Sequence, residues 1–188
     1  TCDYLVHNAP ALIAIQEQKM HLCMPAVEFL TIKPSFHMQA AHFHGGAFVI
    51  YVDILGESFS LTVDTGAPGP ISLSNKSAQR IPACYADHRV SIRQKGINGE
   101  EVCSEIVETD FFFAGHSIRA PVFINSIGND EVDGYIGLSV LRGFDILITP
   151  DEIGFRRNRN RIRTMEDFTD FASPGGCGLS IRCLNSTT

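Results

Sequence analysis

A single acidic residue at the end of an apolar run constrains this chain more than any other feature. Residues 61–67 read Leu-Thr-Val-Asp-Thr-Gly-Ala, and the chain continues at once into Pro68-Gly69-Pro70. The run before Asp64 alternates small polar and apolar residues, as a half-buried strand does. A carboxylate at the end of such a strand costs free energy unless neighbours hydrogen-bond it or a reaction uses it. The fold must therefore give Asp64 hydrogen-bond partners or a chemical role.

The surrounding sequence predicts many short strands. Between residues 45 and 157, β-branched and aromatic runs alternate with turns that contain Gly, Asn or Pro, a pattern typical of an all-β sandwich or closed barrel. Asn98-Gly99 is a strong hairpin signal within residues 95–100. The expected strands are residues 47–55, 58–63, 71–73, 90–93, 102–113, 118–124, 145–149 and 153–156, and residues 135–141 are expected to pass from strand to short helix.

The two ends of the chain lie outside this pattern. Residues 1–44 are expected to be an N-terminal extension that acts as an arm, a docking segment or a pro-like segment, and residues 158–188 a C-terminal extension. Within the first we expect a short helix in residues 11–24, ending before Pro25, and a strand over residues 27–32.

A helical turn is expected over residues 75–81 with Asn75 as its N-cap.

The basic residues are concentrated near the end of this pattern. Five arginines fall within residues 156–163. Such a run is typical of a solvated or disordered face, with docking of RNA, an acidic partner or an acidic membrane surface as the alternative.

Composition narrows the function classes. The chain has 188 residues, 44% of them hydrophobic, and a formal net charge of −6, so one domain core and no general attraction to nucleic acid are expected. No run is long enough for a transmembrane segment. The six cysteines form no Cys-x-x-Cys motif, which disfavours a zinc or redox site. His37, His42 and His44 lie close in sequence, and a solvated or locally hydrogen-bonded set is favoured over a metal site.

The chemistry that best uses Asp64 is peptide hydrolysis by paired carboxylates. Two carboxyl groups that share a site cannot both ionise, so one holds a proton while the other accepts one from water. A glycine after the acid lets the backbone turn tightly and direct its N–H at the carboxylate.

The motif and its surroundings resemble the aspartic protease family. Val-Asp-Thr-Gly-Ala at residues 63–67 is similar to the family's active-site signature in its single-lobe, retropepsin-like form. About seventy residues on, the sequence from Asp133 to Arg142 resembles the second signature, whose loop interlocks with the active-site loop. Residues 144–149 and 153–155 resemble the closing hairpin of such a lobe, and the resemblance covers residues 46–157.

The resemblance implies roles for individual residues. Asp64 would be the catalytic acid, Thr65 would brace two active-site loops against each other, and Gly66 would orient the carboxylates through its N–H. Ala67 would contact the substrate, a polypeptide. The residues Gly96, Ile97, Asn98 and Gly99 would form a flap that closes over it. Neither a cofactor nor a metal is implied.

The number of motifs determines the expected assembly. Enzymes of the pepsin type carry two Asp-Thr/Ser-Gly motifs in one chain, whereas this chain has one. A working site would need a homodimer with one Asp64 from each copy. The first alternative is a non-catalytic structural or binding subunit of the same fold inside a larger protein assembly. The second is a domain that binds a peptide or ubiquitin-like partner in the flap cleft without cleaving it.

Three features depart from the family pattern. Pro68 and Pro70 directly follow the motif and remove two backbone donors. Ser139 stands where many relatives carry an acidic residue. The terminal extensions are long for a retropepsin lobe, whose ends usually build the dimer sheet.

Overall fold

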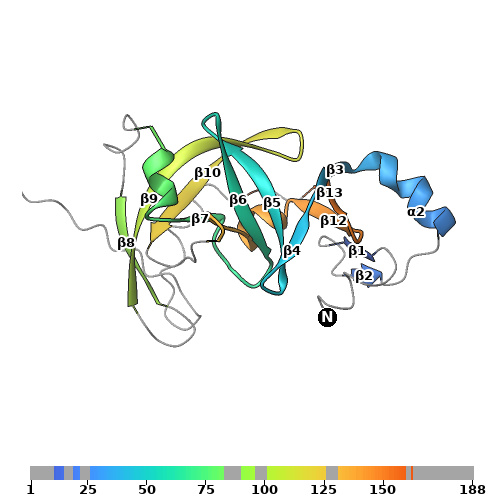
Figure 1. The fold of residues 1–188 in the computed structure, drawn as a ribbon, viewed down its shortest axis with the longest axis horizontal. Coiled ribbons are helices and arrows are strands. Elements are labelled where there is room, and N and C mark those ends of the chain that lie inside the picture. The colour runs from blue at the N-terminus through green and yellow to red at the C-terminus, as the bar shows by residue number, and fades with distance from the viewer. Residues whose placement is uncertain are drawn as a thin grey trace, which may run out of the picture.

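Two β-sheets make up most of the part of the chain that the structure describes. The computed structural model describes residues 11–14, 19–21, 26–82, 90–95, 101–125, 131–159 and 162. These residues form an eight-stranded sheet and a five-stranded sheet, with short helices beside them (Figure 1). The all-β class expected from the sequence is confirmed, and the described residues also contain two short α-helices.

The eight-stranded sheet holds the central part of the chain, in the order β4-β5-β6-β11-β7-β10-β9-β8. Its strands are β4 (His42–His44), β5 (Ala47–Ile54), β6 (Glu57–Asp64), β7 (Ile71–Ser74), β8 (Val90–Lys95), β9 (Glu101–Phe113), β10 (His116–Asn125) and β11 (Gly134–Gly137). Asp53 also pairs with Phe112, and Ile54 with Phe111. These two pairs join β5 to β9, so the sheet curls back on itself around the core.

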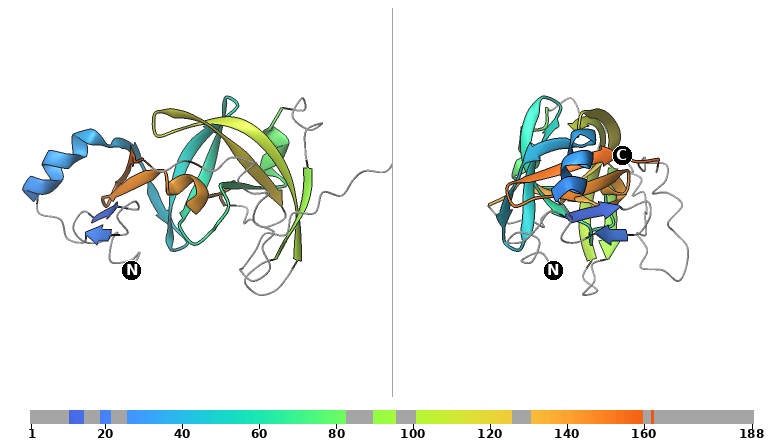
Figure 2. Two further views of the ribbon diagram at one scale, coloured as in Figure 1. Left: turned by 180° about the vertical axis from the view of Figure 1, so that it is seen from behind. Right: turned by 90° about the vertical axis from the view of Figure 1, so that its right-hand side faces the viewer.

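The five-stranded sheet, which we call the terminal sheet, combines both ends of the described chain in the order β2-β1-β12-β13-β3. Its strands are β1 (Ala11–Ala14), β2 (Lys19–His21), β3 (His37–Ala40), β12 (Phe144–Ile148) and β13 (Glu152–Arg157). The helix α2 (Ala26–Ile32) lies at this end of the molecule, far from β8 (Figures 1 and 2). The 3₁₀ turn η1 (Lys33–Ser35) leads from α2 into β3.

Two expectations for the N-terminal segment are wrong. The described parts of residues 11–24 form β1 and β2 rather than a helix, because β12 pairs with β1 and places Leu12 opposite Leu147. Residues 27–32, expected to be a strand, belong to α2. Such a short apolar run does not distinguish helix from strand, and the acidic Glu28 in the first turn favours the helix.

The central strands are present as expected, with ends shifted by a few residues. The helical turn expected over residues 75–81 is the 3₁₀ turn η2 (Ser77–Arg80), but Asn75 is not its cap. The Ser77 N–H instead donates to the Ser74 hydroxyl at 3.1 Å. The Asn75 N–H donates to the Asn125 carbonyl at 3.0 Å, which ties this turn to β10.

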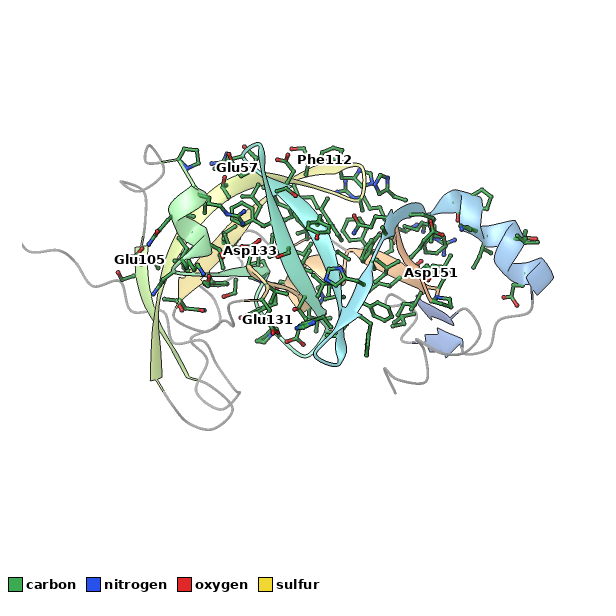
Figure 3. The ribbon with its side chains drawn as sticks, in the orientation of Figure 1. Glu57, Glu105, Phe112, Glu131, Asp133 and Asp151 are labelled. Carbon is green, nitrogen blue, oxygen red and sulfur yellow. The ribbon has the colours of Figure 1, made fainter. Side chains whose placement is uncertain are left out.

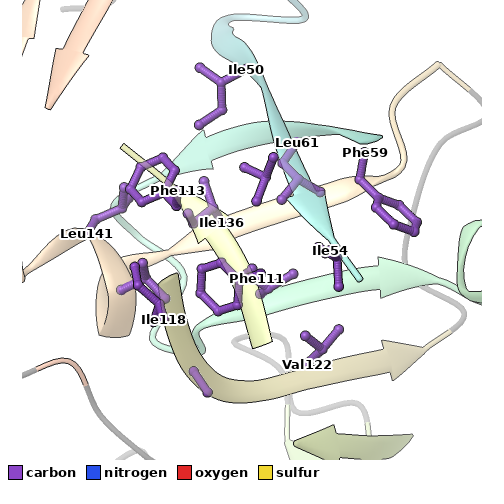
Figure 4. Close-up of a cluster of buried hydrophobic side chains, with 14 of the residues drawn as sticks. Ile50, Ile54, Phe59, Leu61, Phe111, Phe113, Ile118, Val122, Ile136 and Leu141 are labelled. Atoms are coloured by element: carbon purple, nitrogen blue, oxygen red, sulfur yellow. The ribbon is translucent and has the colours of Figure 1, made fainter. Parts of the chain in front are cut away.

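The core lies between the curled sheet and the last hairpin. Ile50, Leu61 and Ile136 are fully buried within it (Figure 4). Phe113 on β9 packs edge-on against Phe144 and Phe155, with ring centroids 5.1 and 4.6 Å apart. This aromatic cluster joins the terminal sheet to the eight-stranded sheet.

One arginine of the basic run has a structural role. The Arg156 guanidinium donates to the Asp145 carboxylate at 2.9 Å and lies 4.6 Å from the centre of the Phe36 ring. Arg156 therefore fastens β13 to β12 and covers Phe36, whereas Arg157 and Arg159 are exposed.

Two functional features are not found in the described part of the chain. None of its helices has the length and apolar character needed to cross a membrane. Its His, Cys, Asp and Glu side chains form no group of three or more that could hold a metal ion.

Candidate active site

Asp64 is the last residue of β6, and the turn that follows hydrogen-bonds its side chain. Oδ1 of Asp64 accepts the N–H of Gly66 at 2.9 Å and the N–H of Ala67 at 3.2 Å. The Ala67 N–H also approaches the Asp64 carbonyl, at 3.3 Å. Asp64 is half-buried, whereas Thr65 and Gly66 are exposed. The turn therefore satisfies one carboxylate oxygen with backbone donors and presents the acid at an open surface.

Residues 65–70, which we call the Asp64 loop, are locked to residues 137–139. Three backbone N–H groups and one hydroxyl donate from the second segment to the first. They run from Gly137 N to Pro70 O (2.6 Å), Leu138 N to Ala67 O (2.7 Å), Ser139 N to Gly69 O (3.4 Å) and Ser139 Oγ to Pro68 O. The Asp64 loop contributes only carbonyl acceptors, so the donors that two prolines remove are not needed here. Ser139 thus serves as a donor to the loop.

The strand β11 brings these two segments together. It pairs in parallel with β6, which places Gly137 opposite Asp64, and antiparallel with β7. A Cβ at Gly137 would overlap the carbonyl oxygens of Gly69 and Ala67, and one at Gly134 would overlap the carbonyl of Ser72. Glycine is required at both positions because the neighbouring backbones approach so closely.

Sequence reasoning missed the role of Asp133, immediately before β11. Its carboxylate accepts hydrogen bonds from the Ser60 N–H (2.8 Å), the Ser60 hydroxyl (3.0 Å) and the Ser77 hydroxyl (2.8 Å). The Arg80 guanidinium lies 2.8 Å away and stacks over the Phe59 ring. Figure 3 shows Asp133 beside β6. Only its place beside Gly134 in the second signature pointed to this residue.

These contacts also set the ionisation of Asp133. Burial acts to raise the pKa of this carboxyl group. The hydrogen bonds from Ser60 and Ser77 and the charge of Arg80 outweigh burial and lower the pKa below its usual value of 3.8. Asp133 is therefore charged at neutral pH and ties β6 and η2 to the start of β11.

The strands β7 and β10, next to β11 in the sheet, carry a buried polar pair, Ser72 and Asn125. The Asn125 side-chain amide donates to the Ser72 hydroxyl at 2.9 Å, and both residues are 1% exposed. The Ser72 hydroxyl is hydrogen-bonded in turn to Tyr135. Burial raises the pKa of the Tyr135 phenol above its usual value of 10.0. The hydrogen bond from Ser72 opposes this rise, and the Asp64 carboxylate adds to it. Tyr135 thus lies within electrostatic reach of Asp64.

Of the other predicted site residues, the structure describes Ala67 and Thr65 but not the flap. Ala67 is buried, with 9% of its surface exposed. The Thr65 side chain is exposed, and its predicted bracing role stays a prediction. The flap residues Gly96, Ile97, Asn98 and Gly99 lie outside the described residues. The strands on either side of them, β8 and β9, pair antiparallel as far as Lys95 and Glu101.

Comparisons with known proteins identify structural neighbours only. No family model and no curated protein matches the sequence. A retropepsin-like aspartic protease from Rickettsia conorii has a TM-score of 0.46 and 17% identity, covering 64% of this chain and 92% of that one. EIAV protease complexed with the inhibitor HBY-793 has a TM-score of 0.41 and 16% identity, covering 54% and 90%. The retroviral protease-like domain of Ddi1 from Leishmania major has a TM-score of 0.38 and 19% identity, covering 61% and 98%. These three solved structures are thus retropepsin-like aspartic proteases or a domain of that type.

Proposed function

We propose that this chain is one subunit of a homodimeric aspartic endopeptidase, in which the Asp64 residues of two copies form the catalytic pair. The geometry of Asp64 carries this proposal. One oxygen of the carboxylate is held by two backbone N–H groups, and the loop that supplies them is locked by four further hydrogen bonds. A structural turn would need neither the rigid loop nor the open surface at the acid.

The reaction follows from two carboxyl groups that share one proton. The ionised Asp64 removes a proton from a water molecule. As it does so, the water oxygen bonds to the scissile carbonyl carbon. The protonated Asp64 donates a hydrogen bond to the developing oxyanion. The C–N bond then breaks, and a proton moves from the carboxyl pair to the leaving amine. Water is consumed, and one new carboxyl group and one new amino group form.

The substrate would lie across the exposed edge of the Asp64 loop. Ala67 would line the cleft beside the acid, and residues 96–99 would close over the peptide and exclude bulk water. A closed, water-poor site strengthens the hydrogen bonds that stabilise the oxyanion. Thr65 would gain its partner from the second subunit, which accounts for its exposure in the single chain.

Cleavage of a random peptide pool between about pH 3 and 7 tests the proposal, because carboxyl pairs work in that range. We expect cleavage that a statine-type transition-state analogue inhibits and that Asp64→Asn abolishes. Circular dichroism should show that the variant is folded. Cleavage that persists in Asp64→Asn would remove this residue from the mechanism.

One observation favours a second candidate function, a structural or binding subunit of a larger assembly. The N-terminal strands β1, β2 and β3 already pair with each other or with the last hairpin in the terminal sheet of one chain. If these strands occupy the surface that would join two copies, Asp64 stays unpaired. Light scattering at micromolar concentration separates the two candidates, since the enzyme must be a dimer and the structural subunit is expected to be a monomer on its own.

A further inference from the structure

One face of four neighbouring strands near Asp64 is polar. The strands β6, β11, β7 and β10 lie side by side in this order. Tyr135 pairs with Thr62 on one side and Ser72 on the other, Gly137 pairs with Asp64, and Asn125 pairs with Ser74. Alternate residues of a strand share a face. The polar face therefore carries Ser60, Thr62, Asp64, Ser72, Ser74, Asn125 and Tyr135, while Leu61, Ile71, Leu73 and Ile136 face the core. Its apolar member on β10 is the buried Phe123, which pairs with Ser72.

Burial of part of this face requires an explanation. Ser72 and Asn125 are each 1% exposed, and buried polar groups weaken a fold unless they are fully hydrogen-bonded. Apolar residues would fill the same positions at less risk to stability. We therefore expect this buried polar pair to have a functional role, which is to hold the half-buried Tyr135.

The hydrogen bonds in this group have a direction. The side-chain NH₂ group of Asn125 is a donor only, and it donates to the Ser72 oxygen at 2.9 Å. The Ser72 hydroxyl proton is then directed to the Tyr135 oxygen, in agreement with the lowering effect of Ser72 on the pKa of Tyr135. Tyr135 accepts this bond and keeps its own proton to donate elsewhere.

Asp64 is a hydrogen-bond acceptor on the same face of the sheet as Tyr135. Both side chains lie on the polar face of adjacent parallel strands, two register positions apart. The Asp64 charge is felt at the phenol. Oδ1 of Asp64 is occupied by Gly66 and Ala67, and no described residue donates to Oδ2. No direct hydrogen bond joins Tyr135 to Asp64 among the described contacts, and a bound water can bridge two polar groups that do not bond directly.

We propose that Tyr135 is a positioning residue of the active site, whose hydroxyl, anchored by Ser72 and Asn125, donates to the attacking water bound at Oδ2 of Asp64. This inference rests on the proposed endopeptidase function. The phenol stays protonated and neutral throughout, and its bond fixes the water oxygen so that a lone pair faces the scissile carbonyl. A water held by both Asp64 and Tyr135 is already oriented for attack, which raises kcat more than it lowers KM.

Few other charges face Tyr135. The strand β7 and the helix α3 (Leu138–Leu141) contain no titratable side chain. On β6 the charged residues are Glu57, at the far end, and Asp64. Asp133 shares the face of Tyr135, but Arg80 balances its charge. Asp64 is therefore the charge to remove in a test.

The first test needs no enzymatic activity. The chain has four tyrosines, and the difference between wild type and Tyr135→Phe isolates the phenolate absorbance of Tyr135 during an alkaline titration. Asp64→Asn should lower the pKa of Tyr135, because it removes a negative charge that raises it. Asp53→Asn, on the outer face of β5, should leave the titration unchanged. Titration curves that are the same in Asp64→Asn and wild type overturn the proposal.

The second test is kinetic. Tyr135→Phe keeps the ring and should lower kcat about tenfold with little change in KM, as expected for the loss of one hydrogen bond near a charged group. Tyr51→Phe is the matched control, because Tyr51 is 58% exposed on β5. The double variant Ser72→Ala/Tyr135→Phe should be no slower than Tyr135→Phe alone, since Ser72 acts through Tyr135.

The outcomes separate this inference from the function on which it rests. Electrostatic coupling in the titration, with full activity in Tyr135→Phe, overturns the positioning role. Coupling in a chain that cleaves no peptide overturns the endopeptidase function, while the electrostatic influence of Asp64 on Tyr135 is supported. Coupling together with a selective loss of kcat supports both.

Discussion

The Asp133 carboxylate offers the sharpest quantitative test of how the site is held. We consider Asp133→Asn, which keeps the shape of the side chain and removes its charge. Both carboxylate oxygens accept hydrogen bonds, one from Ser77 and the other from Ser60. An asparagine can place its oxygen on only one side, so its NH₂ group must face a donor on the other side.

The magnitude follows from the lost contacts. A hydrogen bond to a charged group contributes about 1.5–3 kcal/mol, and the variant loses one such bond and weakens the rest. The ion pair adds about 0–1 kcal/mol, because the Arg80 side chain is 40% exposed and solvent screens its charge. The free energy of unfolding should fall by about 2–4 kcal/mol. This corresponds to a decrease in Tm of roughly 5–15 °C for a chain of this size.

Urea unfolding at neutral pH, monitored by circular dichroism, measures this loss. Asp110→Asn is the control, because Asp110 is 55% exposed and its ion pair with Arg119 is long, at 3.4 Å. It should change stability by less than about 0.5 kcal/mol. A loss of that small size in Asp133→Asn would refute the argument that this carboxylate fastens β6 to β11.

The effect should also depend on pH with a defined sign. The folded-state pKa of Asp133 is lowered below the unfolded value of 3.8, so its contribution is present above that value. The contribution is lost as the pH falls through 3.8 toward the folded-state pKa. The stability difference between wild type and Asp133→Asn should therefore be largest near neutral pH and shrink in acid. A difference that stays constant from neutral to acidic pH would contradict the assigned ionisation.

Three further substitutions test the packing of the site and core. Gly137→Ala should lower the free energy of unfolding by about 1–3 kcal/mol and abolish cleavage, because its Cβ overlaps two carbonyl oxygens of the Asp64 loop; thermal unfolding and the peptide assay measure both effects. Ser139→Ala should cost about 1–3 kcal/mol in urea unfolding, since the Pro68 carbonyl loses its hydroxyl donor. Phe113→Ala should cost about 3–5 kcal/mol by the same measurement, whereas its neighbour Phe112, which is 54% exposed (Figure 3), should tolerate alanine with a change below about 0.5 kcal/mol.

The sequence predicted the Asp64 turn and the central strands because their signals are local. Gly66 directly after Thr65 favours a tight turn. The alternation of polar and apolar residues in β6, and the turn residues between strands, indicate where the strands lie. The sequence from Asp133 to Arg142 could be matched to the Asp64 loop because both motifs are short and occur in order along the chain.

The missed features depend on contacts between distant residues. The strand β1 is a strand because β12 pairs with it, about 130 residues later. Asp133 meets Ser60 only when β11 lies beside β6. The polar face of Tyr135 and Ser72 was visible as an alternation within each strand, but grouping those residues requires the strand order and register.

The proposed pair of Asp64 residues makes the central claim of this account, and subunit mixing tests it most directly. Wild-type chain at fixed concentration is equilibrated with an equal amount of Asp64→Asn chain, and peptide cleavage is measured. If each site needs one Asp64 from each copy, mixed dimers are inactive, and the activity should fall to about half of that of wild type alone. Activity that the added variant does not change would contradict a site shared between two copies.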